Sequence, residues 1–176
     1  FIYSLILWTV FDLSLNYNHA IRSRIKWMSS TLTLLIFLMI LSGGLVAGTR
    51  AGIPFPTWPL MGDTFIPPQI YSMNPSWLSA FEDMATIQFN HRMFAYLLTI
   101  SIIIFAIVLL RSNVPRFLKN GTTALLFVLS LQVALGISTL IFYIPIPVAA
   151  AHQVGAIALL SVSLFITHSC LSREQI

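Results

Sequence analysis

Hydrophobic and polar positions alternate along this chain in long blocks rather than at short periods. Four apolar runs, Trp27 to Ala47, Thr86 to Leu110, Gly121 to Tyr143 and Val148 to Cys170, each reach the roughly 20 residues that cross a bilayer as a helix. Residues 1–15 are apolar but too short to cross, and we expect them to be the end of a truncated transmembrane helix. The pattern predicts an all-α, polytopic transmembrane four-helix bundle preceded by this tail.

Polar segments separate the apolar runs. Residues 16–26 and 111–120 are short and basic, residues 48–85 form a long loop with six prolines, and residues 171–176 are a polar tail. Because Lys and Arg accumulate on the cytoplasmic side of membrane proteins, we place 16–26 and 171–176 in the cytoplasm and loop 48–85 on the outer side. The basic residues on the cytoplasmic side are Arg22, Arg24, Lys26, Arg111, Arg116, Lys119 and Arg173.

Composition agrees with a membrane location. The chain is 57% hydrophobic and 8% charged, whereas soluble domains carry about 25% charged residues. The net charge of +4 lies in loops, where it sets orientation, and does not indicate nucleic-acid binding. The single cysteine, Cys170, excludes an intrachain disulfide.

Two histidines lie inside apolar runs near their outer ends, where an ionisable side chain is costly and therefore indicates function. His91 and His152 both follow the outer end of a run, at a depth of roughly 6–9 Å for a helical rise of 1.5 Å per residue. Matched depth on two helices is what a heme with two imidazole ligands requires. The pair predicts a heme iron between His91 and His152.

Neighbouring residues support this interpretation. Gly155 follows His152 by three positions and would leave room for a flat macrocycle. Arg50 and Arg92 are the basic residues on the outer side and are candidates to pair with heme propionates. Gly44 and Gly48 form a small-xxx-small pair that favours close helix packing.

Other interpretations remain open at this point. A histidine in a transmembrane helix also serves as a hydrogen bonder between helices. We expect His19 and His168 to lie at the membrane interface. A zinc site is not indicated, because no cluster of three or four nitrogen, sulfur or carboxylate ligands occurs in the sequence.

Several motifs, in order, resemble the second half of a heme A synthase. They cover nearly the whole of residues 27–170, which we expect to form one heme-binding transmembrane half. The motifs are Gly43-Gly-Leu-Val-Ala-Gly-Thr-Arg-Ala-Gly52, Thr57-Trp-Pro-Leu-Met61, Phe65-Ile-Pro-Pro68, Asn74-Pro-Ser-Trp77, Phe81-Glu82, Gln88-Phe-Asn-His-Arg92, Gln132-Val-Ala-Leu-Gly-Ile137 and His152-Gln-Val-Gly-Ala156.

The resemblance implies an enzyme of eight transmembrane helices in two four-helix halves, which oxidises the C8 methyl of heme O to a formyl group. It also implies that the second half binds a heme b through histidines matching His91 and His152. In the first half a catalytic glutamate stands three residues before a helix histidine, whereas this chain has Gln88 there. We therefore expect no catalytic residue in this sequence and an inactive fragment, because an amide does not act as acid or base.

The resemblance implies heme O as substrate, the N-terminal half of the same enzyme, heme O synthase and an electron partner such as a quinone. It places the protein in the bacterial inner (plasma) membrane, with the mitochondrial inner membrane as the alternative. The competing functions are a stand-alone membrane heme b electron-transfer subunit and a cofactor-free membrane assembly protein.

Overall fold

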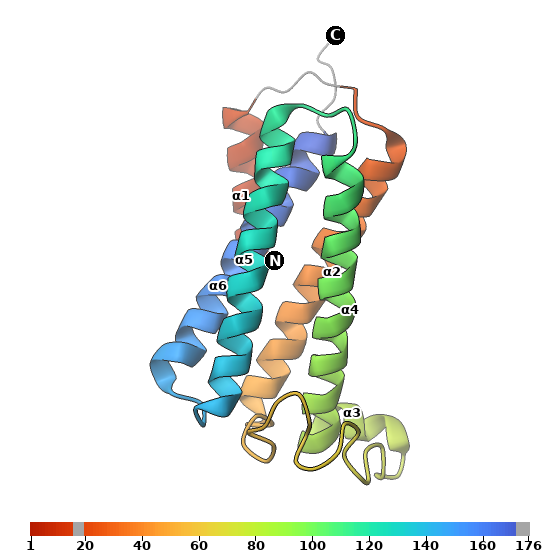
Figure 1. The fold of residues 1–176 in the computed structure, drawn as a ribbon, viewed down its shortest axis with the longest axis vertical. Helices are drawn as coiled ribbons and strands as arrows, with labels where there is room; N and C mark the ends of the chain where they lie inside the picture. The colour runs from red at the N-terminus through yellow and green to blue at the C-terminus, as the bar shows by residue number, and fades with distance from the viewer. Residues whose placement is uncertain (16–19, 172–176) are drawn as a thin grey trace. The chain divides into compact units, whose positions relative to one another are not determined.

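The computed structural model describes residues 1–15 and 20–171, and these form helices joined by loops. Four long helices are apolar and long enough to cross a membrane, which confirms the expected fold class. The described part of the chain contains no strand. In order, the elements are α1 (Ile2–Ser14), α2 (Ser23–Gly48), the 3-10 turn η1 (Ser76–Leu78), α3 (Ser79–Glu82), α4 (Met84–Leu110), α5 (Arg116–Ile141) and α6 (Ile146–Leu171) (Figure 1).

The helices extend beyond the apolar runs at their polar ends. α5 begins at Arg116 rather than Gly121, because the Pro115 carbonyl accepts from the Leu118 backbone N–H at 3.1 Å and starts the helix. α6 begins at Ile146, inside the proline turn, since Pro147 lies in the first turn, where a helix needs no N–H donor.

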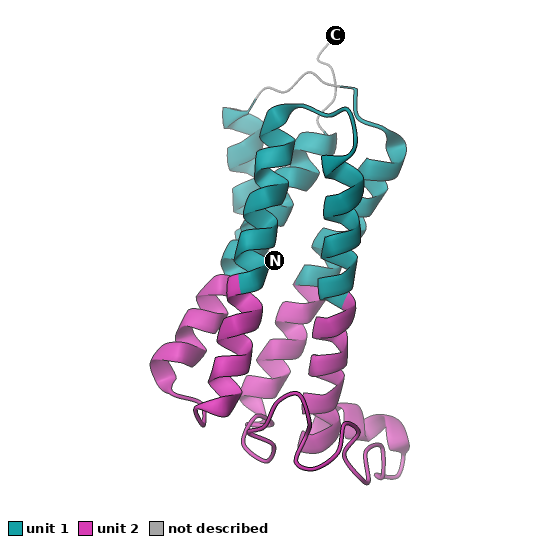
Figure 2. Ribbon diagram, in the orientation of Figure 1, with its two compact units in different colours: residues 1–36, 98–130, 156–176 teal, residues 37–97, 131–155 magenta. Residues whose placement is uncertain are grey.

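The chain divides into two compact units, and each long helix contributes a stretch to both (Figure 2). Unit 1 comprises residues 1–36, 98–130 and 156–176. Its described part contains a well-packed apolar core drawn from α2, α4, α5 and α6. The largest of these buried side chains are Ile25, Ile36, Ile102, Phe105, Leu109, Leu118, Leu125 and Ile166.

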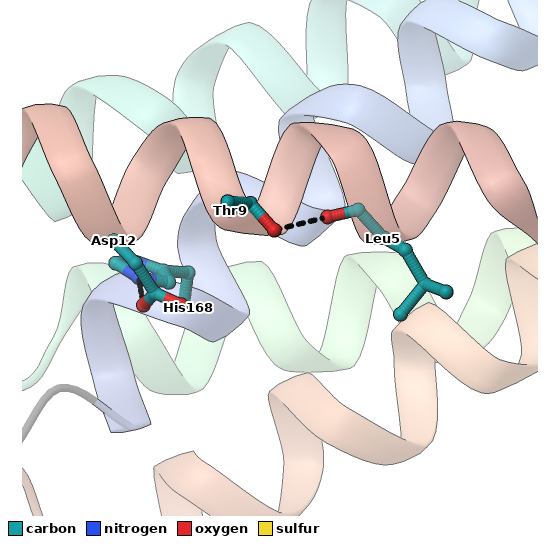
Figure 3. Close-up of polar contacts among 4 residues, drawn as sticks. All are labelled: Leu5, Thr9, Asp12 and His168. Carbon is teal, nitrogen blue, oxygen red and sulfur yellow. Dashed lines mark hydrogen bonds and ion pairs between the residues drawn. The ribbon is translucent and has the colours of Figure 1, made fainter.

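Polar contacts attach α1 to α6 within unit 1. The Tyr3 hydroxyl lies 2.6 Å from the Ser161 hydroxyl, and His168 Nε2 lies 2.7 Å from Asp12 Oδ1. Figure 3 shows the Asp12–His168 contact, with the Thr9 hydroxyl donating to the Leu5 carbonyl within α1. His168 lies in the last turn of α6, where we expect the membrane interface, and it is 3% exposed because Trp8, Phe11 and Asp12 of α1 pack over it. His19 lies outside the described residues.

Unit 2 comprises residues 37–97 and 131–155, all of which the structure describes. Its buried side chains come from the outer loop and the first turns of α4. None of the residues that α2, α5 and α6 contribute to this unit is buried. Among these buried residues are Ala51, Met61, Ser79, Thr86, Ile87, Gln88 and Arg92.

One packing expectation in unit 2 was wrong. A Cβ atom added at Gly44 or Gly48 would meet nothing within 4 Å, so neither residue brings two helices of this chain together. The neighbouring Gly43 is the glycine that faces another helix, because a Cβ there would lie 3.4 Å from Cε1 of His91.

Candidate functional site: two imidazoles held by neighbouring helices

His91 extends from α4 toward α2, where two consecutive residues contact its ring. The Ser42 hydroxyl lies 3.0 Å from Nδ1 of His91. At Gly43, a Cβ would lie 3.4 Å from Cε1 of the same ring, which is a van der Waals distance. Ser42 and Gly43 therefore fix where the imidazole lies and which edge of the ring faces α2.

His152 is held in a similar way by α5. Its Nδ1 lies 3.1 Å from the backbone carbonyl oxygen of Gln132. At Gly136, one turn further along α5, a Cβ would lie only 2.9 Å from Cε1 of His152. Side chains do not tolerate so short a distance, so the ring occupies its place because residue 136 is a glycine.

The hydrogen bond of His152 defines the tautomer of its ring. A backbone carbonyl only accepts hydrogen bonds, so His152 Nδ1 donates, and in the neutral ring the lone pair is then on Nε2. The Ser42 hydroxyl can either donate or accept, and it is the acceptor when His91 has the same tautomer as His152. The interhelical hydrogen bonds expected as an alternative are thus present, and both use Nδ1 rather than Nε2.

The donor set fits a heme better than a bare metal ion. The described residues contain no group of three or more His, Cys, Asp or Glu side chains, which a zinc site requires. A heme supplies four ligands of its own and needs only two imidazoles from the protein. Both rings are only partly buried, so a flat apolar group between them would cover surface that the protein leaves uncovered.

Gln88 and Arg92 lie one turn apart on α4 and attach the outer loop to it. Gln88 Nε2 donates to the Phe55 carbonyl at 3.1 Å. Arg92 Nη2 donates to the same carbonyl at 2.9 Å, and Nη1 donates to the Leu60 carbonyl at 3.1 Å. The two residues expected at the cofactor therefore also position residues 55–60.

Both side chains are buried and retain an unpaired polar atom. Gln88 Oε1 and Arg92 Nε have no hydrogen-bond partner in the described structure, although Gln88 is 1% and Arg92 6% exposed. A buried donor without a partner costs about 1–3 kcal/mol. The orphaned Arg92 Nε–H fits an anionic oxygen such as that of a heme propionate.

Arg50 is exposed and ends α2 in an unusual conformation. Its φ is 56°, in the left-handed region that glycine normally occupies after a helix. The turn is closed by hydrogen bonds from Ala51 N to the Val46 carbonyl at 3.0 Å and from Arg50 N to the Ala47 carbonyl at 3.3 Å. Four other non-glycine residues have a positive φ as well, namely Gln69, Tyr71, Tyr143 and Ile144, so this conformation alone assigns Arg50 no role.

Gly155 has a different neighbour from the expected macrocycle. Its position directly faces the side-chain amide oxygen of Gln132 on α5, so a Cβ there would collide with that oxygen.

Two residues at the site, Ser42 and Gly43, were not predicted from the sequence. The available signal was the small, partly polar Ser42-Gly43-Gly44 patch within an otherwise apolar run.

Residues 1–164 match the sequence model of the COX15-CtaA family, whose description is cytochrome oxidase assembly protein. The chain belongs to this family. Among COX15-CtaA relatives, the heme A synthase of Nitrosospira multiformis is 38% identical over 172 residues, covering 95% of this chain and 48% of the relative. The heme A synthase of Paracoccus denitrificans is 38% identical over 173 residues, covering 95% and 45%.

The similarity extends to a mammalian relative. Heme A synthase COX15 of Bos taurus is 39% identical over 132 residues, which cover 75% of this chain and 32% of the relative. This COX15-CtaA chain spans about half the length of the bacterial relatives and about a third of the bovine one. No solved structure matches it. With its four long apolar helices, the chain is part of an integral membrane protein.

Proposed function

We propose that this chain is the heme b-binding, C-terminal half of a heme A synthase, the oxidoreductase that converts the C8 methyl of heme O to a formyl group. The observation that carries the proposal is that His91 and His152 each form a hydrogen bond with a neighbouring helix through Nδ1. Family membership and the relatives named heme A synthase support the reaction. When bound, the heme would carry one electron at a time.

The residues of this chain have distinct roles in the proposal. Nε2 of His91 and Nε2 of His152 would be the two ligands that the protein supplies to the heme iron. Arg92, through Nε, and Arg50 would pair with the heme propionates at the outer side. Gln88 keeps the first turn of α4 attached to the loop by its bond to the Phe55 carbonyl and transfers no proton.

The chemistry of methyl oxidation belongs to residues outside this chain. Gln88 stands three residues before His91 and carries a neutral amide, so it provides no acid or base there. Residues 1–176 alone are inactive in this proposal and act with the N-terminal half of the enzyme. Heme O, heme O synthase and a quinone as electron partner are the other partners, in the bacterial inner membrane or its mitochondrial counterpart.

The test compares His91→Ala and His152→Ala in the intact gene product, with Gln153→Ala as control because Gln153 is an exposed neighbour on α6. We expect each histidine variant to lose the b-type band in the reduced-minus-oxidised spectrum, while the control keeps it. Full heme retention in either histidine variant would contradict the assignment of that histidine as a ligand. Supplying heme O and analysing the product separates the enzyme from a stand-alone electron-transfer subunit, which would form no heme A.

A further inference from the structure

We propose that Ser42 is a positioning residue for His91. Its hydroxyl oxygen accepts a hydrogen bond from the Nδ1–H group, which leaves the lone pair on Nε2 for the iron. The inference rests on the proposed function and adds a residue to that site. The Ser42 hydroxyl and His91 Nδ1 are 3.0 Å apart and belong to different helices, α2 and α4. The contact therefore depends on the tertiary structure and not on local sequence.

Ser42 uses its hydroxyl differently from Ser30 and Thr49, and like Thr33, whose hydroxyl bonds the Ser163 and Thr167 hydroxyls of α6. Ser30 donates to the Lys26 carbonyl at 3.0 Å, and Thr49, just beyond the end of α2, donates to the Leu45 carbonyl at 2.7 Å. Such bonds to the preceding turn are the usual arrangement in apolar helices. Within the described residues, the Ser42 hydroxyl bonds the imidazole of His91. It therefore connects α2 to the neighbouring helix α4.

The two histidines differ in how the acceptor is supplied. His152 bonds a backbone carbonyl, which no side-chain substitution removes. His91 bonds a side chain, so one substitution abolishes its acceptor. An acceptor on Nδ1 makes Nε2 more basic, which favours the ferric over the ferrous heme and lowers the midpoint potential. Ser42 therefore tunes His91 while leaving His152 unchanged.

The surroundings of Ser42 allow a clean substitution. Ser42 borders a cavity of about 360 Å³, so an added methyl group has space. Threonine and valine at position 42 have nearly the same shape and the same helix cost, and they differ in the hydroxyl alone. The other residues around the cavity are Leu41, Leu45, Ala80, Phe81, Ile87 and Asn90.

The experiment compares Ser42→Val with Ser42→Thr in the intact gene product and measures heme retention, midpoint potential and the low-spin ferric EPR signal. We expect the valine variant to lose heme about tenfold more readily and to shift the potential upward, while threonine matches the wild type. Ser130→Val is the control, because the Ser130 hydroxyl bonds only its own helix, at the Leu126 carbonyl.

Each outcome decides between the two proposals. If His91→Ala loses the heme but valine and threonine at position 42 behave alike, Ser42 has no positioning role and the proposed function stands. If His91→Ala keeps an unchanged heme signal, the ligand assignment and the role of Ser42 both fail. Should neither branched variant accumulate, Ser42→Ala against the wild type decides in the same way, with the same expected upward shift of the potential.

Discussion

At the scale of single residues, the site depends on which nitrogen of an imidazole is occupied. Nδ1 of His91 and Nδ1 of His152 make the interhelical hydrogen bonds, which leaves the opposite edge of each ring for a ligand. A membrane histidine that forms an interhelical hydrogen bond through Nδ1 can therefore also bind a metal through Nε2. Sequence shows that a histidine is present, but the partner of each nitrogen comes from residues that are distant along the chain.

Glycine positions provide the sharpest test at this scale. In Gly136→Ala the new Cβ would lie 2.9 Å from Cε1 of His152, so the ring must move from its place. We expect heme affinity to fall about tenfold, the lower end of the effect seen when a ligand's support is disturbed. The measurement is heme bound per protein after purification.

Gly44→Ala is the matched control, because a Cβ there meets nothing within 4 Å. It makes the same chemical change in another transmembrane helix and should leave the bound heme unchanged. Equal heme content in the two variants would show that the close approach of Gly136 to His152 does not position the ring.

At the scale of elements, hydropathy located the helices but not their ends. The apolar runs mark the part of each helix that faces lipid, while hydrogen bonding continues into polar flanks, as it does from Arg116 to Asn120 in α5. The contact between α1 and α6 could not be predicted in the same way. Asp12 and His168 are more than 150 positions apart, and nothing in their local sequence pairs them.

The α1–α6 contact makes a prediction about stability. Asp12→Ala removes the acceptor of the hydrogen bond to His168 Nε2 and leaves that imidazole with one bond fewer. We expect the free energy of unfolding to fall by roughly 1–3 kcal/mol, read as a lower thermal midpoint in detergent. Asp12→Asn keeps an acceptor oxygen and should lose less. A thermal midpoint for Asp12→Ala equal to that of the wild type would refute the prediction.

At the scale of the whole molecule, the two units differ in how they are stabilised. Unit 1 has a continuous apolar core, whereas the stretches of α2, α5 and α6 in unit 2 have no buried residue. Packing contacts, rather than removal of apolar surface from water, hold membrane helices together. The proposed heme would therefore add contacts chiefly in unit 2, where these helix stretches bury no residue of their own.

Heme removal tests this difference directly. We expect hydrogen exchange of residues 131–155 to become faster in the heme-free protein, while exchange in residues 98–130 stays the same. The measurement is hydrogen–deuterium exchange by mass spectrometry on heme-loaded and heme-depleted intact gene product. Equal acceleration in both stretches would show that the heme stabilises the chain globally and not through unit 2.

The sequence by itself determined the fold class and singled out the two histidines. A membrane span needs apolar residues along its whole length, so an ionisable residue within it is easily recognised. The tertiary structure alone decided what supports them: Ser42 and Gly43 against His91, and Gly136 and the Gln132 carbonyl against His152. Contacts between helices depend on which faces meet, and in an apolar run no periodicity marks a face. The same reason explains why Gly43, and not Gly44, makes the close approach.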